Sequence, residues 1–127
     1  MHHTIHFACT SHIGLRRAIN QDNFLCDGRI MQIHDDQTEF PLCGTVSSAD
    51  NTLFGIFDGM GGEECGEAAA HIAAAKAAQL QTENNPAAQL LQFCRDANTA
   101  ICEYADKNGL FSSGTTASSP LPSSKPT

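Results

Sequence analysis

The sequence predicts an α+β domain in which short strands come first and two helices follow. Apolar residues alternate with polar ones, or form short runs, in the part of the chain that ends at Asp58. Apolar residues then recur at helical spacing in residues 63–81 and 86–108. Two amphipathic helices that follow strands are expected to flank a sheet as an antiparallel pair. A chain of 127 residues suits one small domain of this kind.

Three strands are predicted before residue 50. Residues 3–10 alternate between two faces, with Ile5, Phe7 and Cys9 on one of them, which is typical of a half-buried strand. Residues 24–33 form a second candidate, interrupted by Asp27-Gly28, a hairpin turn signal. A short third strand is expected within residues 42–46, in a stretch that is otherwise polar and irregular.

The first predicted helix, residues 63–81, is rich in alanine. Glu63, Glu64 and Glu67 lie in or near its first turns, where the helix dipole favours negative charge. Its expected apolar face consists of Cys65, Ala69, Ile72, Ala73 and Leu80.

The second predicted helix has clear signals at both ends. Asn85 can serve as N-cap with Pro86 as the first helical residue, and the helix should end near Gly109. Its expected apolar face consists of Leu90, Cys94, Ala97, Ile101 and Tyr104.

The stretch from Leu53 to Gly62 is the centre of the chemical prediction. Its apolar run up to Phe57 predicts a strand with both faces covered. Asp58 then ends the run, and three glycines follow within four positions. The Asp58 carboxylate and the Gly59 carbonyl are oxygen donors of the kind that hard cations prefer. The alternative is a strand end with an Asx-type turn that caps the next helix.

The connection that spans residues 11–23 carries a second set of candidate residues. Arg17 stands close in sequence to the polar run Asn20-Gln21-Asp22-Asn23. A guanidinium group can hold a phosphate by two parallel hydrogen bonds, and a carboxylate can hold a cation. The alternatives are a surface salt bridge for Arg17 and a turn residue for Asp22.

Composition excludes several classes of protein. The formal net charge of −7 argues against non-specific binding to nucleic acid or to an anionic membrane. The sequence has no apolar run of membrane-spanning length, and its first residues do not resemble a secretory signal. We therefore expect a cytoplasmic protein with reduced thiols. None of the six cysteines forms a Cys-x-x-Cys pair, and most are expected to be small core residues.

Three separated segments, taken in order, resemble the metal-dependent protein phosphatases of type 2C, and the bacterial branch in particular. They are Arg17 with residues 20–24, residues 54–62, and Ser113-Gly114-Thr115-Thr116-Ala117. The resemblance covers residues 4–117. It implies a β-sandwich flanked by helices, with a centre of two Mn²⁺ or Mg²⁺ ions that hydrolyses phosphoserine or phosphothreonine in a phosphoprotein substrate.

The resemblance also implies a role for each candidate residue. Asp58 would bridge both metals, and Gly59 would offer its carbonyl oxygen. Asp22 would bind metal or orient metal-coordinated water, and Arg17 would clamp the substrate phosphate. Two such ions can activate water and neutralise phosphoryl oxygens.

The sequence departs from the family pattern at several points. Gln21 stands where many members have glutamate, and Met60 stands where eukaryotic members have a histidine proposed as general acid. No acidic residue follows Asp106, so the family's later metal-binding aspartates have no counterpart. Residues 1–117 are therefore interpreted as the N-terminal half of such a domain, as a truncated or frameshifted reading frame would give. Residues 118–127, rich in proline and serine, are expected to be a disordered tail.

Impaired phosphatase activity is the consequence expected of an incomplete metal centre. Two other readings stay open. One is a non-catalytic fragment that binds a protein partner, and the other is an unrelated one-metal hydrolase that uses Asp58 and Asp22.

Overall fold

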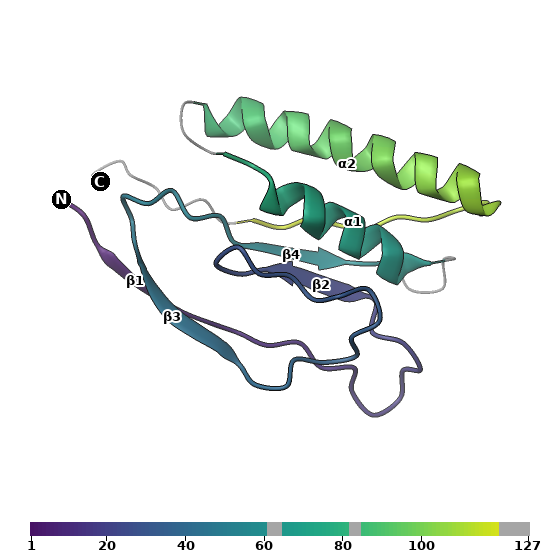
Figure 1. Cartoon of the computed structure of the whole chain (residues 1–127), viewed down its shortest axis with the longest axis horizontal. Helices are drawn as coiled ribbons and strands as arrows, with labels where there is room; N and C mark the ends of the chain where they lie inside the picture. Colours follow the sequence, from purple (N-terminus) through teal and green to yellow (C-terminus); the bar gives the residue numbers. More distant parts are fainter. Residues whose placement is uncertain (61–64, 82–84, 120–127) are drawn as a thin grey trace.

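The fold was analysed in a computed structural model of the chain, which describes residues 1–60, 65–81 and 85–119. Within these ranges the chain forms four strands and then two helices (Figure 1). The strands are β1 (Thr4–Cys9), β2 (Asp22–Leu25), β3 (Leu42–Ser47) and β4 (Gly55–Asp58), and the helices are α1 (Gly66–Ala78) and α2 (Pro86–Asn108). The predicted α+β class is therefore confirmed.

The strands form two antiparallel pairs. β1 pairs with β3 over six residues, from Thr4 opposite Ser47 to Cys9 opposite Leu42. β2 pairs with β4 over four residues, and this register places Asp22 directly opposite Asp58. Each pair joins strands that are distant in sequence, so the hydrogen bonds within each sheet close long loops.

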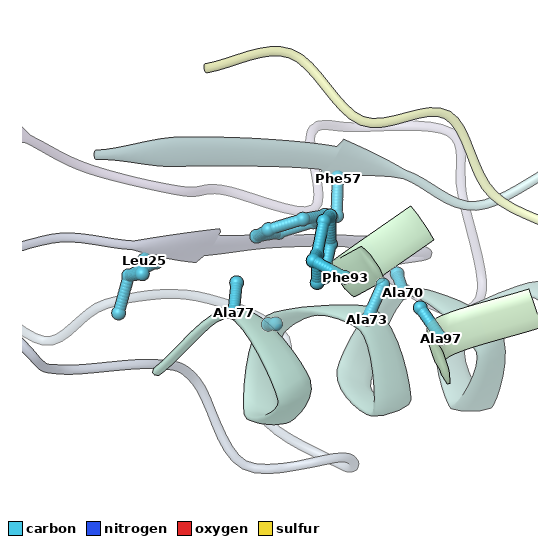
Figure 2. Packing of buried hydrophobic residues seen from close by; sticks show 8 residues of the cluster. Leu25, Phe57, Ala70, Ala73, Ala77, Phe93 and Ala97 are labelled. Atoms are coloured by element: carbon cyan, nitrogen blue, oxygen red, sulfur yellow. The ribbon is translucent and has the colours of Figure 1, made fainter. Parts of the chain in front are cut away.

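The β2–β4 sheet lies between the helices and the β1–β3 sheet. Figure 1 shows α1 running beside β2 and β4, with α2 on its outer side and antiparallel to it. On the helix side, Leu25 and Phe57 pack against four alanines of α1 and against Phe93 and Ala97 of α2 (Figure 2). The Phe57 and Phe93 rings meet edge to face with their centroids 6.3 Å apart. Small alanine side chains on the buried face of α1 let this helix approach the sheet closely.

A second apolar cluster lies between the two sheets. Phe24, Cys26 and Met31 are buried in it, and Phe7, Cys9, Leu42 and Phe54 pack around them. The alternation in β1 places Phe7 and Cys9 toward this cluster, as the sequence predicts, because Thr4, His6 and Ala8 are exposed. The fold therefore has three successive layers, which are the two helices, the β2–β4 sheet and the β1–β3 sheet.

Several sequence predictions are confirmed by the structure. The strands predicted within residues 3–10 and 42–46 are β1 and β3. Asp27 and Gly28 both have positive φ, and Cys26 and Arg29 exchange two backbone hydrogen bonds across them, which makes a two-residue hairpin. The strand that this turn interrupts is shorter than predicted, since only residues 22–25 form β2.

The signals at the ends of α2 are also confirmed. Asn85 accepts a hydrogen bond from the Ala88 backbone N–H at 3.1 Å, and Pro86 is the first helical residue. Gly109 ends the helix in the left-handed conformation. No helix in the described part of the chain is long and apolar enough to cross a membrane.

The predicted apolar faces need correction. Ile56 is 54% exposed, so the prediction that β4 is covered on both faces is wrong: the β1–β3 sheet does not cover this side chain. In α2, Ala97 and Ile101 are buried as predicted, but the third buried residue is Phe93, and the neighbouring Cys94 is exposed. The buried face of α1 consists of small residues. Ile72 in this helix and Leu80, which follows it, are only partly buried.

The prediction that most cysteines are core residues is also wrong. Cys26 is buried, but Cys43, Cys94 and Cys102 are exposed. Helix α1 begins at Gly66, and the predicted helical residues Glu63 and Glu64 lie outside the described residues.

The extended segment after α2 runs along the free side of β4. Ile56 and Ser118 exchange two backbone hydrogen bonds of 2.8 and 2.9 Å, and Met60 donates to the Gly114 carbonyl at 3.0 Å. The pairing consists of isolated bridges, Ile56 with Ser118 and Gly59 with Thr115. It extends to Ser118, one residue beyond the boundary predicted at 117, and residues 120–127 of the predicted tail lie outside the described part.

Candidate functional site

A cleft of about 430 Å³ opens where β2 begins and β4 ends. The four site residues predicted from the sequence, Arg17, Asp22, Asp58 and Gly59, all line it. The remaining wall is formed by His12, Ile13, Ile19, Asn20 and Gln21. Two segments that are distant in sequence therefore meet here, namely the loop that leads into the first residue of β2 and the end of β4.

The two aspartates face each other across the sheet. Asp22 and Asp58 are cross-strand partners, and the next residue, Gly59, donates its N–H to the Gln21 carbonyl at 3.0 Å. Because hydrogen-bonded and non-hydrogen-bonded pairs alternate in an antiparallel sheet, Asp22 and Asp58 form a non-hydrogen-bonded pair. Side chains are closest at such pairs, so the register itself brings the carboxyl groups together.

The chemistry of the pair shows in the pKa of Asp22. Partial burial raises this pKa most, and the charge of Asp58 and a hydrogen bond between the two side chains raise it further. The positive charge of Arg17 acts in the opposite direction. Two carboxylates held together repel each other unless a proton or a cation lies between them. Either a proton shared by the two carboxyl groups or a bound cation would relieve this repulsion.

Asn20 is a buried residue that fixes the position of Asp22. Its Oδ1 accepts a hydrogen bond from the Asp22 backbone N–H at 3.1 Å. Its Nδ2 donates to Ser11 Oγ and to the Asp36 carbonyl, both at 2.9 Å. Asn20 therefore links the start of β2 to the beginning of the same connection, at Ser11, and to the loop before β3, at Asp36.

Asn23 performs a similar task on the opposite face of β2. Its Oδ1 accepts from the Met31 backbone N–H, and its Nδ2 donates to the Met31 carbonyl, both at 3.0 Å. In the sequence, Asn20 and Asn23 stand out only as parts of a polar run. Two asparagines on either side of an aspartate, at the start of a strand, are the signal that could have indicated that their side chains hold this strand in place by hydrogen bonds.

Gly59 is a position where a side chain does not fit. A Cβ atom there would collide with the backbone carbonyl oxygens of Gly66 and Gln21. These two groups belong to the start of α1 and to the loop before β2, so glycine lets three backbone segments converge. The close approach gives a structural reason for glycine directly after Asp58.

His12 is a cleft residue that the sequence analysis did not identify. Its Nδ1 accepts a hydrogen bond from the Gly14 backbone N–H at 2.8 Å. Its backbone bridges to Gln37, which connects this wall of the cleft to the loop before β3. No pattern in the sequence marks it, because Gln37, which connects it to another loop, is far away along the chain.

The cleft offers few side-chain donors for a metal ion. In the described ranges, no group of three or more His, Cys, Asp and Glu side chains is arranged to hold a metal ion. Mg²⁺ and Mn²⁺ prefer about six oxygen donors, of which some are water or substrate oxygens. The Asp22–Asp58 pair and the Gly59 carbonyl fit such a cation as some of its ligands, and the others would have to come from elsewhere.

Comparison with known proteins gives no match: no family model, no curated protein and no solved structure corresponds to this chain. The cleft itself is therefore the main indication of function.

Proposed function

We propose that the cleft is the aspartate-bearing part of a type 2C-like phosphatase centre, which hydrolyses phosphoserine or phosphothreonine in a phosphoprotein with the help of Mn²⁺ or Mg²⁺. The observation that supports this most is the cross-strand pair of Asp22 and Asp58, with Arg17 lining the same cleft. A cation site beside an exposed guanidinium group suits a phosphate ester, because both groups attract its oxygens. The proposed place of action is the cytoplasm, where the thiols would be reduced.

Each residue has a specific task in this proposal. Asp22 and Asp58 hold the cations, and Gly59 offers a carbonyl oxygen while letting the backbone segments converge. Asn20 keeps Asp22 in place, and Arg17 binds the phosphoryl oxygens of the substrate. When bound, the metal ions supply an activated water and neutralise phosphoryl charge.

Titration with Mn²⁺, followed by calorimetry, tests the proposal. The chain should bind Mn²⁺ weakly, because it offers few of the ligands that the cation needs. Asp58→Asn should abolish this binding. Asp106→Asn makes the same charge change on the exposed side of α2, and it should leave binding unaltered. Tight binding that survives Asp58→Asn would disprove the assignment.

Phosphatase activity is the second readout. The isolated chain should turn over a phosphoserine peptide slowly or not at all, since further metal ligands have to come from another polypeptide segment. Robust Mn²⁺-dependent turnover that Asp58→Asn does not reduce would contradict the proposed centre.

A second candidate function is a protein-binding module without catalysis. The exposed Ile56 favours it, since this side chain lies on the face of β4 that the β1–β3 sheet leaves uncovered. The pair of carboxylates favours the phosphatase proposal instead, because a protein-binding surface does not need to hold two like charges together. Loss of Mn²⁺ binding in the Asp58→Asn variant separates the two.

A further inference from the structure

Two cysteines from different sheets share the apolar cluster between the sheets. Cys9 is the last residue of β1, and Cys26 directly follows β2. Cys26 is 2% exposed and belongs to the centre of the cluster, and the half-buried Cys9 packs against it. Both cysteines are free in the structure. The contact brings two thiols together at the place where the two sheets meet.

The titration of the thiols reflects this proximity. Burial raises the pKa of Cys9 to about 11, and the charge and hydrogen bond of the neighbouring Cys26 thiol add to the effect. Burial also raises the pKa of Cys26, and the hydrogen bond with Cys9 opposes that rise. Two thiols that share a hydrogen bond in an apolar pocket need little movement to form a covalent bond.

The position of the pair in the chain relates it to the cleft. Residues 10–25 lie between the two cysteines, and they include Arg17, Asn20 and Asp22. Seven of the nine residues that line the cleft belong to this segment. A bond between the two sulfur atoms would therefore close a ring that carries most of the cleft wall.

We propose that Cys9 and Cys26 form a reversible disulfide that fastens the two sheets together and restrains the segment carrying Arg17 and Asp22. Formation of the disulfide does not depend on the phosphatase proposal, but its effect on cation binding rests on that proposal. Peptide mapping tests the disulfide, and Mn²⁺ titration tests its effect on cation binding.

The proposed oxidant is a small-molecule disulfide. One cysteine thiolate attacks it, which forms a mixed disulfide and releases one small thiolate. The second cysteine thiolate then attacks the protein sulfur, and the other small thiolate leaves. Two protons leave the protein, its two sulfurs are oxidised by two electrons in total, and the reagent is reduced to two thiols. Because the thiolate is the reacting form and both pKa values are raised, the reaction should accelerate with increasing pH.

Peptide mapping after treatment with oxidised glutathione tests the pairing. Trypsin separates the relevant cysteines, because Cys9 precedes Arg16, Cys26 lies between Arg17 and Arg29, and Cys43 follows Arg29. After free thiols have been blocked at acidic pH, the Cys9 and Cys26 peptides should appear as one linked species, two hydrogens lighter than their sum. Reduction should separate them. Exclusive linkage of either peptide to the Cys43 peptide would overturn the proposal.

Cys43→Ser is the matched control, because Cys43 is an exposed cysteine on the neighbouring strand β3. The Cys9–Cys26 link should form in this variant and should be lost in Cys26→Ala. In the Cys43→Ser protein, oxidation should raise the melting temperature by roughly 10 °C, since the bond restrains the unfolded chain. An unchanged or lower melting temperature would show that the native fold does not favour the bond.

Mn²⁺ titration of the oxidised and reduced Cys43→Ser proteins tests the coupling to the cleft. The oxidised form should bind Mn²⁺ with an affinity that differs at least threefold from that of the reduced form. Equal affinities, with the linked peptide present, would remove the regulatory part of the proposal. If neither form binds Mn²⁺ while the link forms, the phosphatase proposal fails and the disulfide stands.

Discussion

The two faces of the β2–β4 sheet differ in how completely their side chains are buried. On the helix side, Leu25 and Phe57 are almost completely buried against α1 and α2. On the other side, Phe24 is buried by the second sheet, whereas its cross-strand partner Ile56 is half exposed. Asp22 and Asp58 follow on this same side at the open end. The strand residues on the helix side are all buried, whereas those on the other side are buried only in part.

This difference shows how a small domain can keep a charged pair beside its core. The alternation of a strand sends successive side chains to opposite faces, so Asp58 can follow the buried Phe57 without burying its charge. The helix face stabilises the sheet, and the partly open face leaves room for a ligand. Stability and cation binding should therefore respond separately to substitutions on the two faces.

Removing Phe57 should have the largest effect. Phe57→Ala leaves a cavity against Phe93 and the α1 alanines and should lower the free energy of unfolding by about 3–5 kcal/mol, or prevent folding. Ile56→Ala is the control on the other face, and it should cost less than about 1 kcal/mol because the side chain is half exposed. Urea unfolding measures both. Equal costs would show that the two faces do not differ as described.

Asn20→Ala tests the frame beneath the carboxyl pair. Three hydrogen bonds are lost, and Ser11, Asp36 and Asp22 each lose a partner. The expected cost is about 1–3 kcal/mol in urea unfolding, together with weaker Mn²⁺ binding. Asn98→Ala on the exposed side of α2 is the control and should change stability by less than about 0.5 kcal/mol. A stable Asn20→Ala protein with unaltered binding would mean that Asp22 needs no such support.

Arg17→Lys separates phosphate recognition from general charge. Lysine keeps the charge but cannot present a planar pair of donors. In the presence of Mn²⁺, the dissociation constant for inorganic phosphate should rise by roughly tenfold, which corresponds to about 1.4 kcal/mol. Arg16→Lys is the control at the preceding residue and should have little effect. Equal effects at both positions, measured by NMR titration, would indicate a diffuse basic patch instead of a phosphate clamp.

The pH dependence of stability should carry a small signature of Asp22. Because its pKa is raised in the folded state, the folded protein binds more protons than the unfolded chain between the two pKa values. Asp22 therefore favours the folded state most under acidic conditions, and this contribution is lost as the pH rises through the folded pKa. Asp22→Asn should remove this part of the pH dependence. The effect should be less than about 1 kcal/mol, since the side chain is largely exposed and solvent screens it.

The sequence was most informative where a signal is local. The alternation of β1, the Asp27-Gly28 hairpin and the caps of α2 all depend on neighbouring residues, and the structure has each of them. The exposure of Ile56 and the burial of Phe93 could not be predicted in this way. They depend on how far the second sheet extends and on the exact rotation of α2 against α1.

The candidate site shows the same limit. Arg17, Asp22, Asp58 and Gly59 could be identified because their motifs are contiguous, and the structure brings them to one cleft. The roles assigned to them stay predictions. His12 could not be identified, because its bridge partner is Gln37. The hydrogen bonds of Asn20 with Asp36 and of Asn23 with Met31 could not be predicted either. In all three cases the partner lies eight or more residues away.

The most direct measurement is the melting temperature of wild type and Asp22→Asn, each with and without Mn²⁺, at neutral pH. Without the cation, Asp22→Asn should melt slightly higher than wild type, because the repulsion with Asp58 is relieved. With saturating Mn²⁺, wild type should melt higher than the variant, because only the intact pair binds the cation in the folded state. If the carboxylate pair binds a cation, the difference in melting temperature between wild type and variant should therefore change sign when Mn²⁺ is added. A variant that melts lower than wild type without Mn²⁺, by a margin that Mn²⁺ does not change, would contradict it.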